Sequence, residues 1–328
     1  MKTILFFNNK GGVGKTTLVY HLAYMLSEMG YKTLAVDLDP QANLTSMFLE
    51  EERLIKIYEN DDYRKTILQS IKPLIKGIGD ISEAIIEKIN DKLFLIPGDL
   101  ELSTFEDTLS DNWGKCLDRK EVAFRITSSF YRIIQNSGSA NNFDYAIVDV
   151  GPNLGAINRS TFISSDYIIV PMAADLFSLQ GLKNLGTAAN RWNEEWNERH
   201  SKNPEPTLTL PKGNILPIGY IVMQHVVNEG KPVTAYRKWA DKIPASFKDF
   251  MIKETKTSFE TLETDTYCLS LIKHYRSLMA MAQEARKPIF LLKPADGAIG
   301  AHFNAVKEVY KDFSKLTDNI IKKMDLNV

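Results

Sequence analysis

A glycine-rich turn between an apolar segment and an amphipathic segment constrains the fold of this chain more than any other feature. The apolar run at residues 4–7 predicts a buried strand, and Leu18, Leu22 and Leu26 predict a helix with one apolar face. Between them the chain reads Asn-Asn-Lys-Gly-Gly-Val-Gly-Lys-Thr-Thr from residue 8 to residue 17. Such a turn directs backbone N–H groups and the positive end of a helix dipole toward one point. It is therefore a predicted phosphate-binding loop.

The end of the turn carries the two side chains that this chemistry needs. Lys15 can reach β- and γ-phosphate oxygens, and the hydroxyl of Thr16 can join the shell of a Mg²⁺ ion. The usual pattern is Gly, four residues, then Gly-Lys-Ser/Thr, but here Asn9 stands in place of the first glycine. The residues predicted to bind nucleotide in this turn are Lys10, Gly11, Gly12, Val13, Gly14, Lys15, Thr16 and Thr17.

The string Lys-Gly-Gly-Val-Gly-Lys-Thr-Thr, which begins at Lys10, resembles the deviant Walker A box of the ParA/MinD ATPases. The resemblance implies a P-loop ATPase that uses ATP and Mg²⁺. It also implies that Lys10 reaches across a dimer interface to the nucleotide of a second subunit. The alternative for Lys10 is an ordinary solvated loop lysine. The catalytic residues implied by the resemblance are Lys10, Lys15 and Asp39.

Two carboxylates stand at the end of the second predicted strand, which spans residues 33–38. The chain there reads Asp37-Leu38-Asp39-Pro40-Gln41-Ala42-Asn43. Acids two positions apart on a strand point the same way, and burying both requires a cation or hydrogen-bond donors. The alternative is a strand-end turn with local hydrogen bonds. The string resembles the second box of the ParA family, which implies that Asp39 positions the attacking water or its magnesium neighbour and that Asp37 supports the metal shell.

A third acid, Asp149, ends the apolar strand predicted at residues 144–149. This is the Walker B arrangement, in which a carboxylate at the carboxyl end of a strand holds Mg²⁺ through its waters. Gly151 and Pro152 stand where the family often has Pro-Pro. A tight turn is expected here despite this difference. The predicted metal-binding residues are Thr16, Asp37, Asp39 and Asp149.

The remaining pattern predicts an α/β fold: a doubly wound, mostly parallel sheet flanked by helices. Further short apolar runs at residues 93–97, 166–171, 217–223 and 269–272 predict strands, and helical segments lie between them. We expect one P-loop ATPase domain over residues 1–328, with a helical insertion at about 50–90 and an inserted loop at about 191–214. Residues 136–142 are predicted to form a polar loop, and residues 301–324 a final helix. Trp192 and Trp196 are predicted to pack a helix against the protein core rather than to bind a ligand.

Two further segments resemble the ParA family. Residues just after the 217–223 strand approach the adenine in that family, which implies that Met223 and Gln224 lie near the base. The segment from Asp175 to Leu182 resembles one that opens a helix near the dimer face.

The charge balance limits the kind of nucleic-acid contact. Forty basic and 41 acidic residues give a net charge of −1, so DNA binding would need a local patch. The alternative is ordinary solvated surface. The candidate positions for non-specific DNA binding are Arg237, Lys238, Lys273, Arg276, Arg286 and Lys287.

The resemblance implies an ATP-bound homodimer, a ParB-like protein partner, and a role in plasmid or chromosome partitioning. The alternative is an ATP-gated assembly or positioning factor that acts through protein partners without binding DNA. A nitrogenase-iron-protein relative would need cluster cysteines, which Cys116 and Cys268 do not provide. Five histidines show no ligand-like spacing and are expected on helix surfaces or in loops.

We expect a cytoplasmic protein, associated with the nucleoid if it binds DNA. A strand predicted to start near the N-terminus leaves no room for a cleavable signal peptide, and no apolar run approaches the ~20 residues that span a membrane. The tail from Asp318 to Val328 has no aromatic anchor, so no membrane binding is expected.

Overall fold

The computed structural model describes residues 1–59, 65–225, 227–228, 231–232, 234–254, 261–275 and 277–326. The side chains from residue 224 to residue 236 also lie outside the description. Within the described residues, eight strands form one sheet in the order β10-β7-β6-β1-β5-β2-β4-β3. All neighbours are parallel except β3 and β4. The predicted α/β fold with a mostly parallel sheet is confirmed.

The strands of this sheet are β1 (Lys2–Phe6), β2 (Thr33–Asp37), β3 (Glu87–Lys88), β4 (Leu93–Ile96), β5 (Tyr145–Asp149), β6 (Tyr167–Met172), β7 (Leu216–His225) and β10 (Cys268–Lys273). Two short strands, β8 (Val227–Asn228) and β9 (Lys231–Pro232), pair with each other outside it. The predicted strands at residues 93–97, 166–171, 217–223 and 269–272 correspond to β4, β6, β7 and β10.

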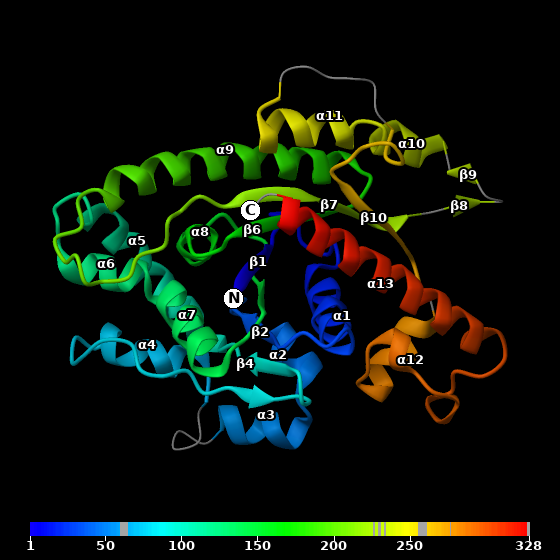
Figure 1. Ribbon diagram of the computed structural model, residues 1–328, viewed down its shortest axis with the longest axis horizontal. Helices are drawn as coiled ribbons and strands as arrows, with labels where there is room; N and C mark the ends of the chain where they lie inside the picture. The colour runs from blue at the N-terminus through cyan, green and yellow to red at the C-terminus, as the bar shows by residue number, and fades with distance from the viewer. Residues whose placement is uncertain are drawn as a thin grey trace.

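Helices cover both faces of the sheet (Figure 1). On the face of Ile4 and Phe6 lie α1 (Lys15–Glu28), α2 (Asn43–Phe48), α3 (Glu51–Tyr58), α12 (Ser277–Ala285) and α13 (Ala301–Leu326). On the face of Leu5 and Phe7 lie α4 (Ile67–Ile75), α5 (Phe105–Lys115), α6 (Glu121–Thr127), α7 (Ser129–Asn141), α8 (Ala156–Ile163), α9 (Leu176–His200) and α11 (Ile243–Phe247). Helix α10 (Thr234–Ala240) precedes α11, and η2 (Leu100–Thr104), η3 (Lys248–Ile252), η4 (Ile289–Leu291) and η5 (Pro294–Asp296) are short helical turns.

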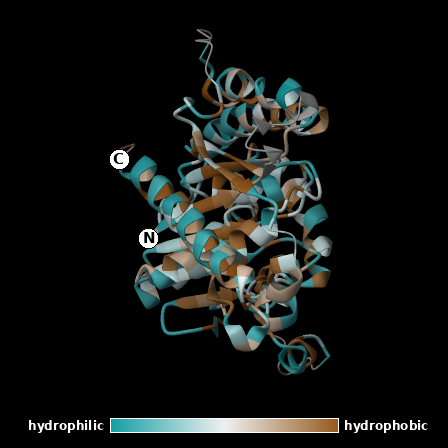
Figure 2. Ribbon diagram, turned by 90° about the vertical axis from the view of Figure 1, so that its right-hand side faces the viewer, coloured by the Kyte–Doolittle hydropathy of each residue, from teal (hydrophilic) through white to brown (hydrophobic). Residues whose placement is uncertain are grey.

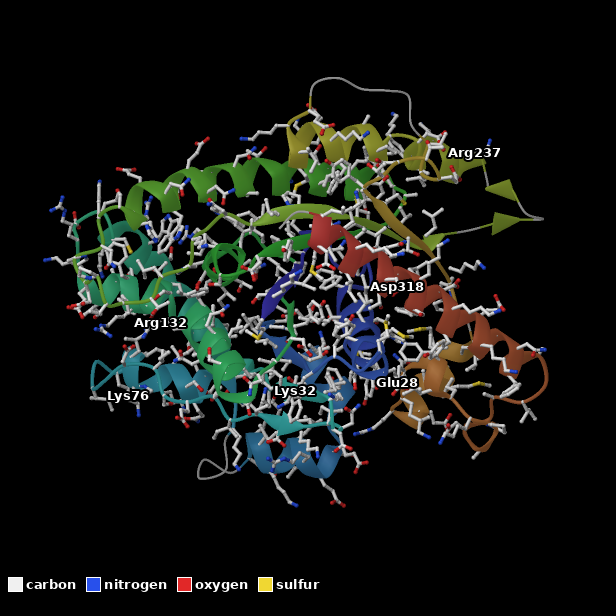
Figure 3. The ribbon with its side chains drawn as sticks, in the orientation of Figure 1. Glu28, Lys32, Lys76, Arg132, Arg237 and Asp318 are labelled. Atoms are coloured by element: carbon white, nitrogen blue, oxygen red, sulfur yellow. The ribbon has the colours of Figure 1, made fainter. Side chains whose placement is uncertain are left out.

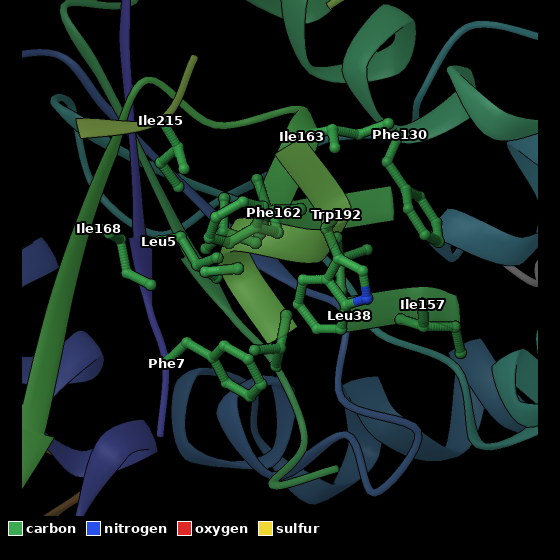
Figure 4. Packing of buried hydrophobic residues seen from close by; sticks show 14 of the residues in the cluster. Leu5, Phe7, Leu38, Phe130, Ile157, Phe162, Ile163, Ile168, Trp192 and Ile215 are labelled. Carbon is green, nitrogen blue, oxygen red and sulfur yellow. The ribbon is translucent and has the colours of Figure 1, made fainter. Parts of the chain in front are cut away.

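The alternation of side chains along each strand separates two apolar clusters, one on each face. Figure 2 shows the hydrophobic colour concentrated in the central strands and the hydrophilic colour on the outer helices. Figure 4 shows Leu5 and Phe7 in the same apolar cluster as Phe162 of α8 and Trp192 of α9.

The two tryptophans of α9 have the packing role predicted for them. Trp192 and Trp196 are 1% and 0% exposed. The indole N–H of Trp196 also donates to the Pro211 carbonyl oxygen at 2.9 Å, which ties the segment after α9 back onto the helix.

Two local predictions were wrong. Residues 136–141 are the end of α7 rather than a polar loop, and the helix ends at Asn142 in the left-handed conformation. Tertiary packing overrides the weak helix propensity there, because Gly138 lets the Met1 side chain approach closely. Strand β2 ends at Asp37, so Asp39 lies in the following loop rather than on the strand.

Opposite ends of the chain meet at the surface, where the Lys2 ammonium lies 2.7 Å from the Asp325 carboxylate. Among the residues that the structure describes, no helix is both long enough and apolar enough to cross a bilayer.

Candidate nucleotide-binding site

The glycine-rich turn connects β1 to α1 at the carboxyl end of the sheet. Gly12 and Gly14 have φ values of 72° and 83°, a left-handed backbone that side chains rarely allow, and Gly14 caps α1. The Lys15 side chain folds back over the turn. Its ammonium donates to the carbonyl oxygens of Asn8 and Lys10 at 3.0 and 3.4 Å. Burial lowers the pKa of Lys15, while Asp149 and Asp39 oppose this shift.

The start of the turn is fixed by the buried side chain of Asn8. Its amide donates to the Pro171 carbonyl oxygen at 2.7 Å, and its carbonyl oxygen accepts from the Lys10 N–H at 2.9 Å. The Lys10 ammonium forms an ion pair with the Asp175 carboxylate. Lys10 therefore has a specific partner in its own subunit, unlike a freely solvated loop lysine.

Asp37 and Asp149 lie side by side at the ends of β2 and β5, because these two residues are in register. The Asp37 carboxylate is fully used by nearby donors. Its Oδ2 accepts from the backbone N–H and the hydroxyl of Thr45 at 2.8 and 2.7 Å, and its Oδ1 accepts from the Asp39 N–H at 3.2 Å. Burial raises the pKa of Asp37 to about 6. These contacts suit Asp37 to holding the loop that carries Asp39.

Asp149 has the opposite environment. It is fully buried, and neither carboxylate oxygen has a hydrogen bond of ordinary geometry within the described residues. Burial, reinforced by the charge of Asp37, raises the pKa of Asp149 to about 8, although the nearby Thr16 hydroxyl and Lys15 ammonium oppose the shift. A buried carboxylate without donors is costly unless a cation compensates it.

This donor set fits Mg²⁺ in the way that phosphate loops hold it. Within the described ranges, no three His, Cys, Asp or Glu side chains converge as a complete metal site. Mg²⁺ does not need one, because it usually takes one or two carboxylates and completes its octahedron with phosphate and water oxygens. The unpaired Asp149 carboxylate and the Thr16 hydroxyl supply protein oxygens at this place.

Asp39 lies at the wall of an open cleft next to the turn. It is 7% exposed, and its Oδ1 accepts from the Gln41 N–H at 3.0 Å. The cleft has a volume of about 540 Å³. Its lining residues are Gly11, Gly12, Gly14, Lys15, Thr16, Thr17, Asp39, Gln41, Asn43, Ser46, Met47, Pro152 and Gln283. Thus the fold brings the first two sequence boxes to one cavity.

A smaller, largely apolar pocket of about 120 Å³ adjoins this cleft and shares Gly14 and Thr17 with it. Met223 lines this pocket, and its Cε lies 3.2 Å from the position of a Cβ built on Gly14. The side chain of Gln224 lies outside the description. The sequence did not predict the other residues that line this pocket, which are Leu18, His21, Ile272, Lys273, His274, Tyr275, Met279, Ile289 and Phe313. The signal available was the polar triplet at residues 273–275, directly after the last strand.

His21 contradicts the expectation that each histidine lies on a surface or in a loop. It is buried in α1, and burial lowers its pKa to about 4. Its Nδ1 lies 2.7 Å from the Thr17 carbonyl oxygen, and its Nε2 accepts from the Ile289 N–H at 3.1 Å. These two contacts require a neutral ring protonated at Nδ1. His21 therefore links the first turn of α1 to the C-terminal segment.

The five candidate DNA-binding residues that the structure describes lie in different places. Arg286 donates to the Leu49 carbonyl oxygen at 2.9 Å, Lys287 pairs with Asp296 at 2.7 Å, and Lys273 lines the apolar pocket. Arg276 lies outside the described residues. Only Arg237 and Lys238 of this set stand together as exposed residues on α10.

Comparison with known sequences identifies the family. The AAA_31 family model, described as an AAA domain, matches residues 1–201. An uncharacterized protein of Methanocaldococcus jannaschii is 34% identical over 259 residues, which are 71% of this chain and 90% of that protein. The chromosome-partitioning ATPase Soj of Treponema pallidum is 28% identical over 184 residues, which are 56% of this chain and 62% of Soj.

Solved structures share the fold along the whole chain. A protein of Corynebacterium diphtheriae superposes with a TM-score of 0.75 at 25% identity and full coverage of both chains. A plasmid partition protein of Borrelia burgdorferi has a TM-score of 0.56 at 20% identity, with 98% of each chain covered. Because the family model covers most of the chain, the first two boxes line one cleft and Asp149 of the third lies beside Asp37, this chain belongs to the ParA/MinD family of P-loop ATPases.

Proposed function

We propose that this protein is an ATP-driven switch that dimerises with Mg-ATP, binds DNA non-specifically as a dimer, and resets by slow hydrolysis during plasmid or chromosome partitioning. The observation that carries the proposal is the buried Asp149 carboxylate, which lies near Thr16 and Lys15 but has no hydrogen bond of ordinary geometry within the described residues. Relatives support the biological role, since Soj of Treponema pallidum is a chromosome-partitioning ATPase. We also take residues 1–328 as one domain, because one apolar cluster runs from Ile4 to Met324.

The residues of the cleft divide the work of ATP hydrolysis. The backbone N–H groups of the glycine-rich turn and the Lys15 ammonium bind the phosphates, and the apolar pocket around Met223 takes the adenine. Thr16 and Asp149 would hold Mg²⁺, while Asp37 fixes the adjacent loop. When bound there, Mg²⁺ would supply positive charge to the phosphate oxygens. Asp39 orients the attacking water and accepts its proton.

Lys10 completes the charge neutralisation on a second subunit. In-line transfer of the γ-phosphoryl group builds up negative charge that positive side chains stabilise. Lys15 supplies one such charge within the subunit, and Lys10 of the other copy supplies the second. ATP would then hold two subunits together, and hydrolysis would release them. Slow turnover follows, because the rate is limited by assembly of this shared site.

The first test is the size of the protein with ATP and with ADP, measured by light scattering with Mg²⁺ present. We expect a dimer with ATP and a monomer with ADP. In Asp39→Ala the water is no longer oriented, so turnover should fall about 10²-fold and the ATP dimer should persist. A wild-type protein that stays monomeric with ATP would contradict the switch.

We propose that DNA binds at α10 and the turn that follows it rather than at all six predicted positions. Arg237 and Lys238 are exposed there, and Figure 3 shows Arg237 at the outer edge of the molecule. Two ammonium groups, those of Lys238 and Lys242, lie 5.0 and 4.9 Å from the centre of the Trp239 ring. Cation–π contacts of this kind hold flexible lysines in a defined place. Arg237, Lys238 and Lys242 thus form a local basic patch at α10 and the turn after it, on a chain with no global basic field.

Replacing both Lys238 and Lys242 with alanine should weaken DNA binding to the ATP-bound protein and reduce its salt dependence. Each lost phosphate contact lowers the slope of log K against log salt by about 1, so the double variant should lose about 2. The measurement is a salt titration of fluorescent duplex binding. Lys88→Ala, another exposed lysine, is the control and should match the wild type.

The same titration separates the alternative function. If the ATP dimer forms but binds no DNA at low salt, the protein is an ATP-gated assembly or positioning factor that acts through protein partners. Equal DNA binding with ATP and ADP would contradict nucleotide control of the patch. A ParB-like partner is expected to raise turnover of the DNA-bound dimer.

A further inference from the structure

Lys10 is held by Asp175 of its own subunit, and this contact has a consequence for dimerisation. We propose that Asp175 is a positioning residue whose ion pair with Lys10 must open before Lys10 can reach the nucleotide of a second copy. The pair then acts as an intramolecular latch that sets the ATP level at which two copies associate. This inference rests on the proposed trans role of Lys10.

The backbone on both sides of the latch is fixed, so only the side chain of Lys10 has to move. The Asn8 side chain accepts from the Lys10 N–H at 2.9 Å and donates to Pro171 at 2.7 Å. Pro171 belongs to β6, which leads within a few residues to Asp175. The same strand end therefore positions both partners of the ion pair.

Asp175 is pre-organised as an anion. It is the N-cap of α9, and its Oδ1 accepts from the Ser178 N–H at 2.9 Å. Although partial burial opposes ionisation, hydrogen bonds from Lys10 and Ser178 lower the pKa of Asp175. One oxygen thus caps the helix while the other, Oδ2, holds the Lys10 ammonium.

The latch lies at the surface and can open. The side chains of Lys10 and Asp175 are 28% and 35% exposed, and partly exposed ion pairs are individually weak. Next to Asp175, the apolar side chains of Leu176 and Phe177 are 51% and 72% exposed. A second copy covering this apolar pair would approach the latch directly. We therefore assign the apolar surface formed by Leu176 and Phe177 to contact with another copy of this chain. This surface lies on the face from which Lys10 has to extend.

The variant Asp175→Asn tests the latch without removing the helix cap, because asparagine caps helices as well as aspartate does. In the nucleotide-free protein, acylation of Lys10 followed by mass spectrometry should become about two- to fivefold faster, the change expected from breaking a partly exposed ion pair. Each subunit of a dimer opens one latch, so the two- to fivefold change per subunit is squared in the dimerisation constant. The dimerisation constant with ATP should rise about 4- to 25-fold.

Asp325→Asn is the matched control, because it breaks another surface ion pair, with Lys2, far along the sequence from the latch. It should change neither Lys10 labelling nor dimerisation, and melting temperatures should show that all variants are folded. Weaker dimerisation of Asp175→Asn would overturn the latch and indicate that Asp175 pairs across the interface. Unchanged labelling would also overturn it. A wild type that never dimerises would instead refute the proposed function, while faster labelling of the variant would still support the pair.

Discussion

Replacing Lys10 with alanine is expected to lower ATP turnover about 10³-fold while a single subunit still binds nucleotide. A positive side chain supplied in trans to a developing phosphoryl charge is worth about 10³–10⁵ in rate. Nucleotide binding should persist because the Lys15 side chain is untouched and its ammonium bonds to the backbone oxygens of Asn8 and Lys10, which an alanine at position 10 retains. Turnover is measured by phosphate release, and binding by a fluorescent ATP analogue.

Mixing experiments identify the direction in which Lys10 acts. Lys10→Ala subunits that retain Asp39 can still receive Lys10 from a partner, whereas Asp39→Ala subunits retain Lys10 but not the water-orienting acid. A mixture of the two inactive variants should recover part of the wild-type turnover. Lys183→Ala, an exposed lysine on α9, is the control for loss of one positive charge. Full activity of Lys10→Ala as a monomer would contradict the shared site.

The second large effect is expected from Asp149→Asn. This substitution should abolish ATP hydrolysis but raise the stability of the folded protein in the absence of Mg²⁺. The ordinary pKa of the carboxyl is 3.8, and in the folded protein burial raises it to about 8. The folded state therefore binds an extra proton between these values, and its stability falls as pH rises through that window. At pH 8, removing the buried charge should raise the free energy of unfolding by about 2–5 kcal/mol.

The pH and metal dependence distinguish this cause from a general packing effect. Below pH 4 both carboxyl and amide are neutral, so the difference between Asp149→Asn and wild type should nearly vanish. With Mg²⁺ and ATP the wild type should gain stability and the variant should gain much less. Urea unfolding at several pH values, with Asp91→Asn as an exposed control, measures these differences. A variant less stable than wild type at pH 8 without Mg²⁺ would show that the Asp149 charge is already compensated.

Much of the fold was predictable because its signals are local. The glycine-rich turn, the apolar strands ending in Asp37 and Asp149, and the regular spacing of Leu18, Leu22 and Leu26 each depend on a few neighbouring residues. Parallel strands place their carboxyl ends at one edge, so the meeting of Thr16 with Asp149 followed from the strand predictions alone. The segment at residues 136–141 failed because its buried contact is with Met1, which no local pattern contains.

Other properties were decided only by tertiary structure. The sequence treated Asp37 and Asp149 alike, but Thr45 satisfies the first carboxylate and no hydrogen-bond donor within the described residues satisfies the second. The sequence also predicted Arg286 and Lys287 as surface charges for DNA binding. In the structure, Arg286 bonds to a backbone carbonyl and Lys287 pairs with a carboxylate.

The sequence by itself determined the fold class, the phosphate loop and the acids at the strand ends, since covalent order alone places these groups on a parallel sheet. Only the tertiary structure decided which carboxylate, among the described residues, has no hydrogen-bond partner, which basic side chains are held by partners, and that Asp175 holds Lys10. The reason is that hydrogen bonding and burial depend on neighbours brought together from distant parts of the chain, such as the 165 positions that separate the partners of that ion pair.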